Sequence, residues 1–480
     1  MSDGTQTAIL PGETCWTRAR ANRLGVIVDG ADFFRAAKHA MLNARRSIYL
    51  IGWDFDARVK LEPEGRTLEG PDRIGKFLNW LAKHREGLDV RILKWDIGLM
   101  ESLARGETGA LILNWLLHDR VNITLDGAHP PGAAHHMKIL VVDDAIAFCG
   151  GIDITMGRWD TRTHDERRPG RRSPSGRGLK PWHDATTCFD GTAARALGDL
   201  ARIRWLAATG DRLQPPGPAE PVWPEGVEVH FRDIDIGIAR TIPEYRDQHQ
   251  VCEIENATLA IIRAAQRNLY IESQYLASRK ITDAICARLR EPDGPDVVIV
   301  NPEISEGWLR AKAMDGARAR MVALLREADL HGRFFMSYPV NAAGSPIYVH
   351  AKIMIADDRI LKIGSSNLNN RSMGYDTECD IVIEAGEDEP ARRRTIAAIR
   401  DGLVGEHLSR PAEEVAAALQ AHDDRLLAAI SSLHGGERDL RTLPDRPLSP
   451  DEEALAESEM ADPIRPVGVR EMLTSVLRGT

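Results

Sequence analysis

Cysteine pairs of the kind that form disulfides or zinc sites are missing from this 480-residue sequence. Its six cysteines are scattered, and no two of them stand in C-x-x-C spacing. Thiols distributed in this way are typical of a reducing compartment, where they stay unpaired and mostly buried. We therefore expect free cysteines in a cytoplasmic protein.

Long apolar runs are missing too. No stretch reaches the roughly 18 uninterrupted apolar residues of a membrane-spanning helix. The first sixteen residues, MSDGTQTAILPGETCW, lack the basic start and the apolar segment of a signal peptide. We expect any contact with a membrane to be peripheral.

An excess of positive charge is also missing. The sequence has 62 Lys and Arg against 71 Asp and Glu, a formal net charge of −9. Proteins that bind nucleic acids through phosphates need a basic surface, so this balance disfavours a nucleic acid as the partner. The remaining composition is that of an ordinary globular protein, and the length suits two fused half-domains.

What the sequence does contain is one short pattern twice. The first copy lies in HHMKILVVDDAIAFCGGIDI and the second in YVHAKIMIADDRILKIGSSNL. Both contain His-x-Lys-x-x-x-x-Asp, and a glycine follows after six further residues. The matching residues are His136, Lys138, Asp143 and Gly150 in the first copy, and His350, Lys352, Asp357 and Gly364 in the second. A repeat of this kind indicates an internal duplication.

The surrounding sequence supports two similar α/β halves. Residues 36–55 and 257–276 both read as a helix that runs into a strand, and further helix–strand units follow in each half. This alternation predicts mixed, largely parallel β-sheet flanked by helices. We place the N-terminal half at 10–206, a Pro- and Gly-rich linker at 207–228, the C-terminal half at 229–408, and a peripheral helical and Pro-rich tail at 409–480.

The motif itself predicts different roles for its His–Lys pair and its aspartate. The apolar runs KILVVD and KIMIAD read as buried strands, and alternation along a strand puts His and Lys of each copy on one face. Asp143 and Asp357 fall on the other face or in the following turn, where the doubled acids suit a hairpin. We count these two aspartates among the site residues as members of the motif, but we assign them a structural role.

Two His–Lys pairs suit the cleavage of a phosphodiester. One histidine can attack while the other protonates the leaving group, and two lysines can stabilise a tetrahedral anion. Because the lysines supply positive charge, we expect no metal and no cofactor. Glu253 and Glu255, in the segment EIE, could suggest metal ligands, but we interpret them as the start of a helix.

At these residues the chain resembles the phospholipase D superfamily, whose hallmark is a duplicated HxKxxxxD motif followed by GSxN. The second copy matches through Asn367, whereas the first reads GGIDITMGRWD, as in the eukaryotic-type branch. PWHD at 181–184, YIESQY at 270–275 and IART at 238–241 are also similar to that branch. The resemblance covers roughly residues 10–408. Within this branch, the chain resembles the compact bacterial members.

The resemblance implies an active site at the interface between the two halves and a two-step mechanism through a phosphohistidine. His136 would be the nucleophile and His350 the general acid and later base. Lys138, Lys352 and Asn367 would hold the phosphate. Carboxylates of Asp184 and Glu378 would orient the histidine rings. We expect Asp153, an acid beside the phosphate, to bond backbone or Arg158 instead.

Several functions remain open at this point. The first is a phospholipase D that hydrolyses glycerophospholipids at a membrane surface and also transfers the phosphatidyl group to alcohols. The others are a phosphatidyltransferase of the cardiolipin-synthase type, a superfamily nuclease and a non-catalytic lipid-binding relic. We expect a monomer. The basic loop 158–180, flanked by Trp159 and Trp182, could touch lipid headgroups or be solvated.

Overall fold

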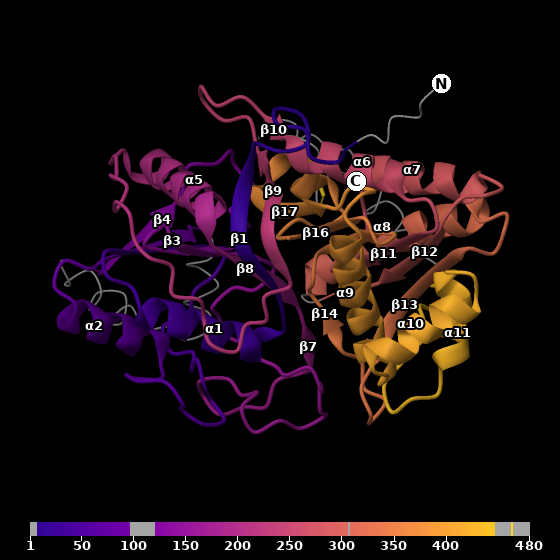
Figure 1. Cartoon of the computed structure of the whole chain (residues 1–480), viewed down its shortest axis with the longest axis horizontal. Helices are drawn as coiled ribbons and strands as arrows, with labels where there is room; N and C mark the ends of the chain where they lie inside the picture. The colour runs from indigo at the N-terminus through magenta and orange to yellow at the C-terminus, as the bar shows by residue number, and fades with distance from the viewer. Residues whose placement is uncertain (1–6, 97–120, 306–307, 447–461, 464–480) are drawn as a thin grey trace, which may run out of the picture.

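One large mixed β-sheet connects the two sides of the molecule (Figure 1). The computed structural model describes residues 7–96, 121–305, 308–446 and 462–463. In the first part of the chain the elements are β1 (Thr17–Val28), α1 (Gly30–Leu42), β2 (Ser47–Gly52), α2 (Ile74–His84), β3 (Asp89–Trp95), β4 (Val121–Asp126), β5 (Ile139–Val142), β6 (Ile146–Gly150), β7 (Trp182–His183), β8 (Ala185–Phe189) and α5 (Gly191–Thr209).

The second part of the chain repeats this series and extends it. Its elements are β9 (Phe231–Ile242), β10 (Val251–Cys252), α6 (Glu253–Ala264), β11 (Asn268–Glu272), α7 (Arg279–Arg290), β12 (Asp296–Val300), α8 (Trp308–Ala328), β13 (Phe334–Val340), β14 (Tyr348–Val349), β15 (Ile353–Ala356), β16 (Ile360–Gly364), the π-helical turn η1 (Arg371–Tyr375), β17 (Glu378–Glu384), α9 (Pro390–Leu408), α10 (Ala412–Ala421), α11 (Leu426–Leu433) and β18 (Asp439–Thr442).

The strand order is symmetric about the centre of the sheet. β1 and β9 lie there as an antiparallel pair, with Ala19 opposite Ile236. Outward from β1 follow β8, β6, β5, β2, β3 and β4, and outward from β9 follow β17, β16, β15, β11, β12 and β13. Corresponding strands occupy corresponding places, so the sheet has an approximate two-fold axis through the β1–β9 pair.

The expectation of a largely parallel sheet is wrong. Among the described strands of the large sheet, parallel pairing occurs in β2–β3–β4 and β11–β12–β13, its two outer parts. β7 and β14 form a separate parallel pair. The strands between the two outer parts pair antiparallel, because each repeated motif folds as the hairpin β5–β6 or β15–β16. Helix–strand alternation predicts parallel pairs only where a helix crosses over between neighbouring strands.

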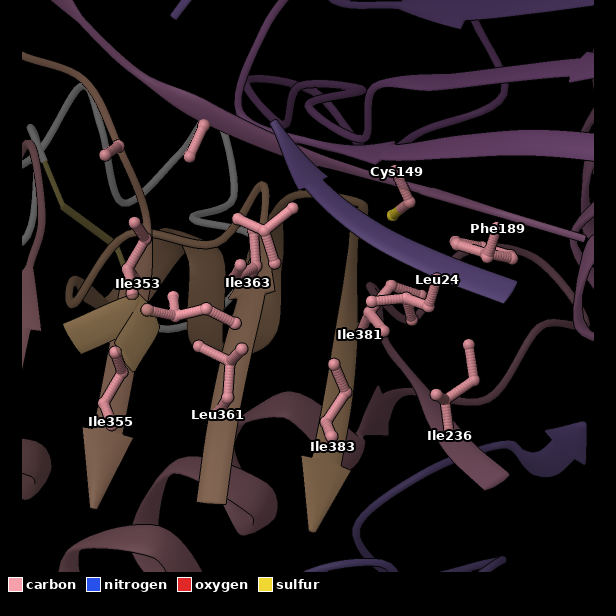
Figure 2. Close-up of a cluster of buried hydrophobic side chains, with 14 of the residues drawn as sticks. Leu24, Cys149, Phe189, Ile236, Ile353, Ile355, Leu361, Ile363, Ile381 and Ile383 are labelled. Atoms are coloured by element: carbon pink, nitrogen blue, oxygen red, sulfur yellow. The ribbon is translucent and has the colours of Figure 1, made fainter. Parts of the chain in front are cut away.

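The core lies on both faces of the sheet. Helices α1 and α2 cover one face of the first half and α5 covers the other, while α6 to α8 and α9 to α11 do the same for the second half (Figure 1). Figure 2 shows side chains that alternate along β15, β16 and β17 and point to one side: Ile353, Ile355, Leu361, Ile363, Ile381 and Ile383. They share one cluster with Leu24 and Phe189 of the first half, so a continuous core joins the halves.

The segment after residue 408 is helical as expected, but it is not peripheral up to residue 443. Val415, Leu419, Leu426 and Ile430 of α10 and α11 are buried in the main core. β18 then pairs antiparallel with β13 and extends the sheet. Most of the Pro-rich stretch lies outside the described residues, as does the rest of the tail apart from residues 462–463. Within the described ranges, no helix combines the length and apolar character that a membrane crossing requires.

The motif aspartates fix the turn between a helix and a strand. Asp143 has a φ of 54°, and its carboxylate accepts hydrogen bonds at 2.7–2.8 Å from the backbone N–H groups of Arg45, Arg46 and Ser47. These three residues connect α1 to β2. A single carboxylate therefore holds three donors that would otherwise lack an acceptor.

Asp357 does the same in the other half. Its φ is 56°, and its carboxylate accepts at 2.8 Å from the N–H groups of Gln266, Arg267 and Asn268, between α6 and β11. Both aspartates thus tie the end of the motif hairpin to the strand beside it, in a turn as the alternation predicted.

Replacing either aspartate with alanine is expected to lower the free energy of unfolding by about 2–4 kcal/mol, because three backbone donors lose a charged acceptor. Denaturant unfolding of Asp143→Ala and Asp357→Ala measures this loss. The matched control is Asp358→Ala, whose carboxylate pairs with Arg393 where both side chains are 35% exposed. That pair contributes at most about 1 kcal/mol. Equal losses in Asp357→Ala and Asp358→Ala would contradict the structural role.

Candidate active site

Each motif histidine is held by a carboxylate from the opposite half of the chain. Nδ1 of His136 lies 3.0 Å from both carboxylate oxygens of Glu378, at the start of β17. Nδ1 of His350 lies 2.6 Å from Oδ2 of Asp184, which separates β7 from β8. Because Nδ1 is occupied, Nε2 is the nitrogen that each ring has available for chemistry.

The backbone repeats this crossed arrangement. The N–H of His136 donates to the carbonyl of Thr377 at 2.9 Å, one residue before Glu378. The N–H of His350 donates to the carbonyl of His183 at 2.8 Å, one residue before Asp184. Each motif therefore begins on the segment that carries its own orienting acid, and the pairing of β7 with β14 strengthens the second of these contacts.

Burial sets the charge of both pairs. It raises the pKa of Asp184 to about 7 and that of Glu378 to about 8. Burial, followed by the charges of both motif lysines, lowers the pKa of His136 well below its usual range, and the pKa of His350 is lowered likewise. A lowered pKa of the imidazole together with a raised pKa of the carboxyl group is what a buried pair that shares one proton shows. They also leave Nε2 of His136 unprotonated, as a nucleophile requires.

The two lysines occupy equivalent positions. Nζ of Lys138 donates to the carbonyl of His136 at 2.7 Å and lies 3.2 Å from Oδ2 of Asp153. Nζ of Lys352 donates to the carbonyl of His350 and, at 3.4 Å, to Oε1 of Gln274. Both lysine side chains are buried, and burial lowers the pKa of Lys352 to about 7.

Asp153 bonds the backbone, as expected. Its Oδ1 accepts from the N–H of Trp53 at 3.1 Å, while its Oδ2 faces Lys138. The expected alternative partner, Arg158, lies instead over the ring of Trp182, with its guanidinium carbon 4.0 Å from the ring centroid. Asp153 thus neutralises part of the charge of Lys138. Gln274, which is uncharged, does not do this for Lys352.

Asn367 lies in the turn after β16 and is 4% exposed. Its backbone N–H donates to Oγ of Ser372 at 3.0 Å, and its side-chain carbonyl accepts no hydrogen bond from any described residue. Asp143 and Asp357 are not at the site. They follow the far ends of β5 and β15, about 16 Å along the strand from the lysines.

Two serines to which the sequence assigned no role complete the support of Glu378. Oγ of Ser365 donates to Oε2 at 2.5 Å and Oγ of Ser372 donates to Oε1 at 2.7 Å. Ser365 follows Gly364 in the motif, so its position was visible in the sequence. Ser372 lies in η1, and no spacing connects it with the catalytic pattern.

The two tryptophans beside the basic loop have different environments. Trp159 packs in the core with α1 and α2. Trp182 stacks on Tyr348 with ring centroids 4.7 Å apart and lies 5.0 Å from the ring of His350. In the loop, Arg171 pairs with Asp160 at 2.8 Å and is buried, so part of the basic charge is used internally.

Side chains able to hold a metal lie behind the site, not in it. In the described part of the chain, four buried residues, Asp29, His164, His183 and Glu406, offer ligand atoms within 4.8 Å of one another. The EIE segment is the start of α6, as expected, and Glu253 there pairs with Arg240.

Comparisons with known proteins agree with the repeated motif. The family model described as "Cardiolipin synthase, PLD-like domain" matches residues 258–392, which include the second motif. Phospholipase D A of Dictyostelium discoideum is 26% identical over 72% of this chain and phospholipase D beta 2 of Arabidopsis thaliana 25% identical over 79%. The chain spans 31% and 56% of the lengths of these two curated relatives.

A solved structure shares the fold. Phosphatidylserine synthase of Haemophilus influenzae superposes with a TM-score of 0.56 at 13% sequence identity, over 85% of this chain and 95% of that one. Its fold agrees with the α/β architecture described above. The duplicated motif, the matching family model and relatives over most of the chain together support membership of this protein in the phospholipase D superfamily.

Proposed function

We propose that the chain is a phospholipase D-type phosphodiesterase that cleaves glycerophospholipids to phosphatidic acid and a free headgroup. The observation that carries this proposal is the crossed arrangement, in which two histidines with available Nε2 atoms are each backed by a buried carboxylate from the other half. Such a pair can supply a nucleophile and an acid to the same phosphorus.

In the first step Nε2 of His136 attacks the phosphorus, and the bond from phosphorus to the headgroup oxygen breaks. Glu378 accepts from Nδ1–H and stabilises the positive charge that forms on the ring. His350 binds a proton at Nε2 when the negatively charged phosphate enters the site, and it gives that proton to the departing headgroup oxygen. Lys138, Lys352 and Asn367 bind the phosphoryl oxygens, whose charge is greatest in the trigonal bipyramidal transition state.

In the second step water attacks the phosphohistidine. His350, now unprotonated at Nε2, takes a proton from that water, and the bond from phosphorus to His136 breaks. A small alcohol in place of water gives a phosphatidyl alcohol by the same path. The proposed partner is thus a phospholipid at a membrane surface, approached peripherally, by a protein that we propose to be monomeric and cytoplasmic.

The names of the relatives support hydrolysis, while one observation supports transfer. The family model that matches the second half carries the description of a cardiolipin synthase. A phosphatidyltransferase would share the first step and differ in the acceptor, which would be a lipid alcohol. Measuring how the intermediate divides between water and alcohols separates the two reactions.

The orienting acids give the first activity prediction. Asp184→Asn and Glu378→Gln should each lower kcat by about 100- to 10,000-fold, because the neutral amide holds the wrong imidazole tautomer and cannot stabilise imidazolium. Hydrolysis of a water-dispersed phosphodiester and thermal unfolding should be measured together. The control is Glu384→Gln, at the other end of β17, which should keep its activity within about twofold because Glu384 pairs with Arg359 away from the site. Full activity in both test variants would remove their proposed role.

Lys352 gives the second prediction. Its pKa is lowered to about 7, so its charge is present below pH 7 and is lost as the pH rises through 7. Because kcat/KM reports the free enzyme, it should fall above about pH 7, far below the usual titration of lysine. In Lys352→Arg, which stays charged, activity should be lower and this alkaline fall should disappear. An unchanged alkaline limb in Lys352→Arg would assign the fall to another group.

The third prediction tests the proposed function itself. With a substrate whose leaving group needs no proton, such as a p-nitrophenyl phosphodiester, His350→Asn should accumulate an acid-labile phosphohistidine on His136, visible by mass spectrometry. His136→Asn should form none. Wild-type protein with phospholipid vesicles and ethanol should make phosphatidylethanol at the expense of phosphatidic acid.

Each contrary outcome of this experiment has a defined meaning. An adduct on His350 would reverse the roles of the two histidines. Little phosphatidic acid without added alcohol would favour the transferase. Neither adduct nor phosphatidylethanol would contradict the covalent mechanism.

A further inference from the structure

A second group of chemically active side chains lies buried directly behind Asp184. Its members, Asp29, His164, His183 and Glu406, have no role in the proposed reaction. They come from the end of β1, the basic loop, β7 and α9, and the described structure leaves each of them at most 6% exposed. Two imidazoles and two carboxylates in an apolar interior need a physical reason.

The distances within this cluster match those of a tetrahedral metal site. Nε2 of His164 lies 3.3 Å from Oδ2 of Asp29 and 3.1 Å from Oε1 of Glu406. Nδ1 of His183 lies 3.4 Å from Oδ1 of Asp29 and 3.2 Å from the same Oε1 of Glu406. Four ligands at about 2.0 Å from a tetrahedral zinc ion are about 3.3 Å apart, which is close to these four distances. With one ligand atom from each residue, all four ligand atoms lie within 4.8 Å of one another.

Two of the ligand atoms lack a hydrogen bond. Oδ2 of Asp29 and Nδ1 of His183 form none with any described residue, although both side chains are almost fully buried. The other atoms of the same two groups are occupied. Oδ1 of Asp29 accepts from the N–H of Asp184 at 3.1 Å, and Nε2 of His183 donates to Glu272 at 2.7 Å. Both atoms without a hydrogen bond face other members of the cluster, at 3.3 Å for Oδ2 of Asp29 and His164 and 3.2 Å for Nδ1 of His183 and Glu406.

Carboxylates behind both histidines fix the ring nitrogens. Nδ1 of His164 lies 3.2 Å from Asp160, which is held in turn by Arg171. Glu272, behind His183, also accepts from Tyr270 at 2.5 Å and from His407 at 3.1 Å. In metal sites such a carboxylate takes the proton-bearing nitrogen of the ring and leaves the other nitrogen to the ion.

We propose that Asp29, His164, His183 and Glu406 bind a tetrahedral first-row divalent cation, with zinc as the best match to the donors. Two nitrogens and two oxygens suit zinc, and two carboxylates balance its charge. All four positions are filled by protein, as in a structural site, so the ion would not touch the substrate.

The proposed ion would hold the parts of the molecule that position Asp184. His164 and His183 lie on the two sides of the basic loop's arginine-rich middle, and Glu406 belongs to the other half of the chain. Asp29 bonds the backbone of Asp184 twice: its N–H donates to the carbonyl of Asp184 at 2.8 Å, and its Oδ1 accepts from the N–H of Asp184 at 3.1 Å. The cluster thus joins the loop, both halves and the acid that orients His350.

The competing account places protons where the ion would be. Although burial opposes it, Asp29 raises the pKa of His164 to about 9, and the pKa of His183 is also raised. Two imidazolium groups would balance two carboxylates just as a divalent ion does. Metal binding would therefore release two protons, and only a direct measurement of metal separates the two accounts.

The test measures metal and does not depend on activity. Full-length protein, purified without chelator and dialysed, should contain about one zinc per chain by elemental analysis. After removal of zinc by a chelator in mild denaturant and refolding, addition of Co²⁺ should give the intense visible bands of a tetrahedral cobalt site, and zinc should abolish them. The single variants His164→Gln and Glu406→Gln should reduce bound metal at least about tenfold.

A matched control comes from another buried histidine. His135 lies 3.0 Å from Asp126 and is 2% exposed, but it is not part of the cluster. His135→Gln should therefore retain wild-type metal content. Wild-type protein that binds neither zinc nor tetrahedral Co²⁺ would overturn the proposal in favour of the protonated cluster. Equal metal in the wild type, His164→Gln and Glu406→Gln would also overturn it, because the ion would then be adventitious.

Discussion

The antiparallel pair β1–β9 is the contact on which the rest of the molecule depends. It makes one sheet out of two halves and places their motif hairpins on either side of an approximate two-fold axis. Because of this axis, the ring of each motif histidine reaches the acid of the other half. The dyads of the site are therefore a consequence of how the sheet is joined, and a shift in the β1–β9 register would disturb both at once.

Electrostatics at the site follow from the same geometry. Bringing both motifs together buries two lysines and two histidine–carboxyl pairs in one place, where desolvation favours neutral forms and moves the pKa values of acids up and of bases down. A phosphate entering this site would supply the opposing charge that Lys352 lacks and that Asp153 supplies only in part for Lys138. The site thus carries positive charge that nearby acids balance only in part. The free energy that this charge costs the folded protein is offset by burial of the surrounding core.

The repeated motif, the α/β class and the structural turn of Asp143 and Asp357 could be predicted from the sequence, because they depend on local spacing and strand alternation. The crossing of Asp184 and Glu378 could not, since it depends on which strands meet at the centre of the sheet. Helix–strand alternation also suggested too much parallel pairing, and Ala-rich helices after residue 408 gave no sign of β18. His164, His183 and Glu406 share no spacing, so only the fold brings them together.

Each motif histidine is oriented by a carboxylate of the other half, and this arrangement bears on the origin of the chain. A protein made of one half alone would carry a histidine without its acid and an acid without its histidine. Two identical copies, paired through β1 across a true two-fold axis, would regain both dyads. Gene fusion of such a homodimer preserves the geometry while freeing the copies to diverge. The present differences, such as Asp153 beside one lysine and Gln274 beside the other, are differences that strict symmetry would have forbidden.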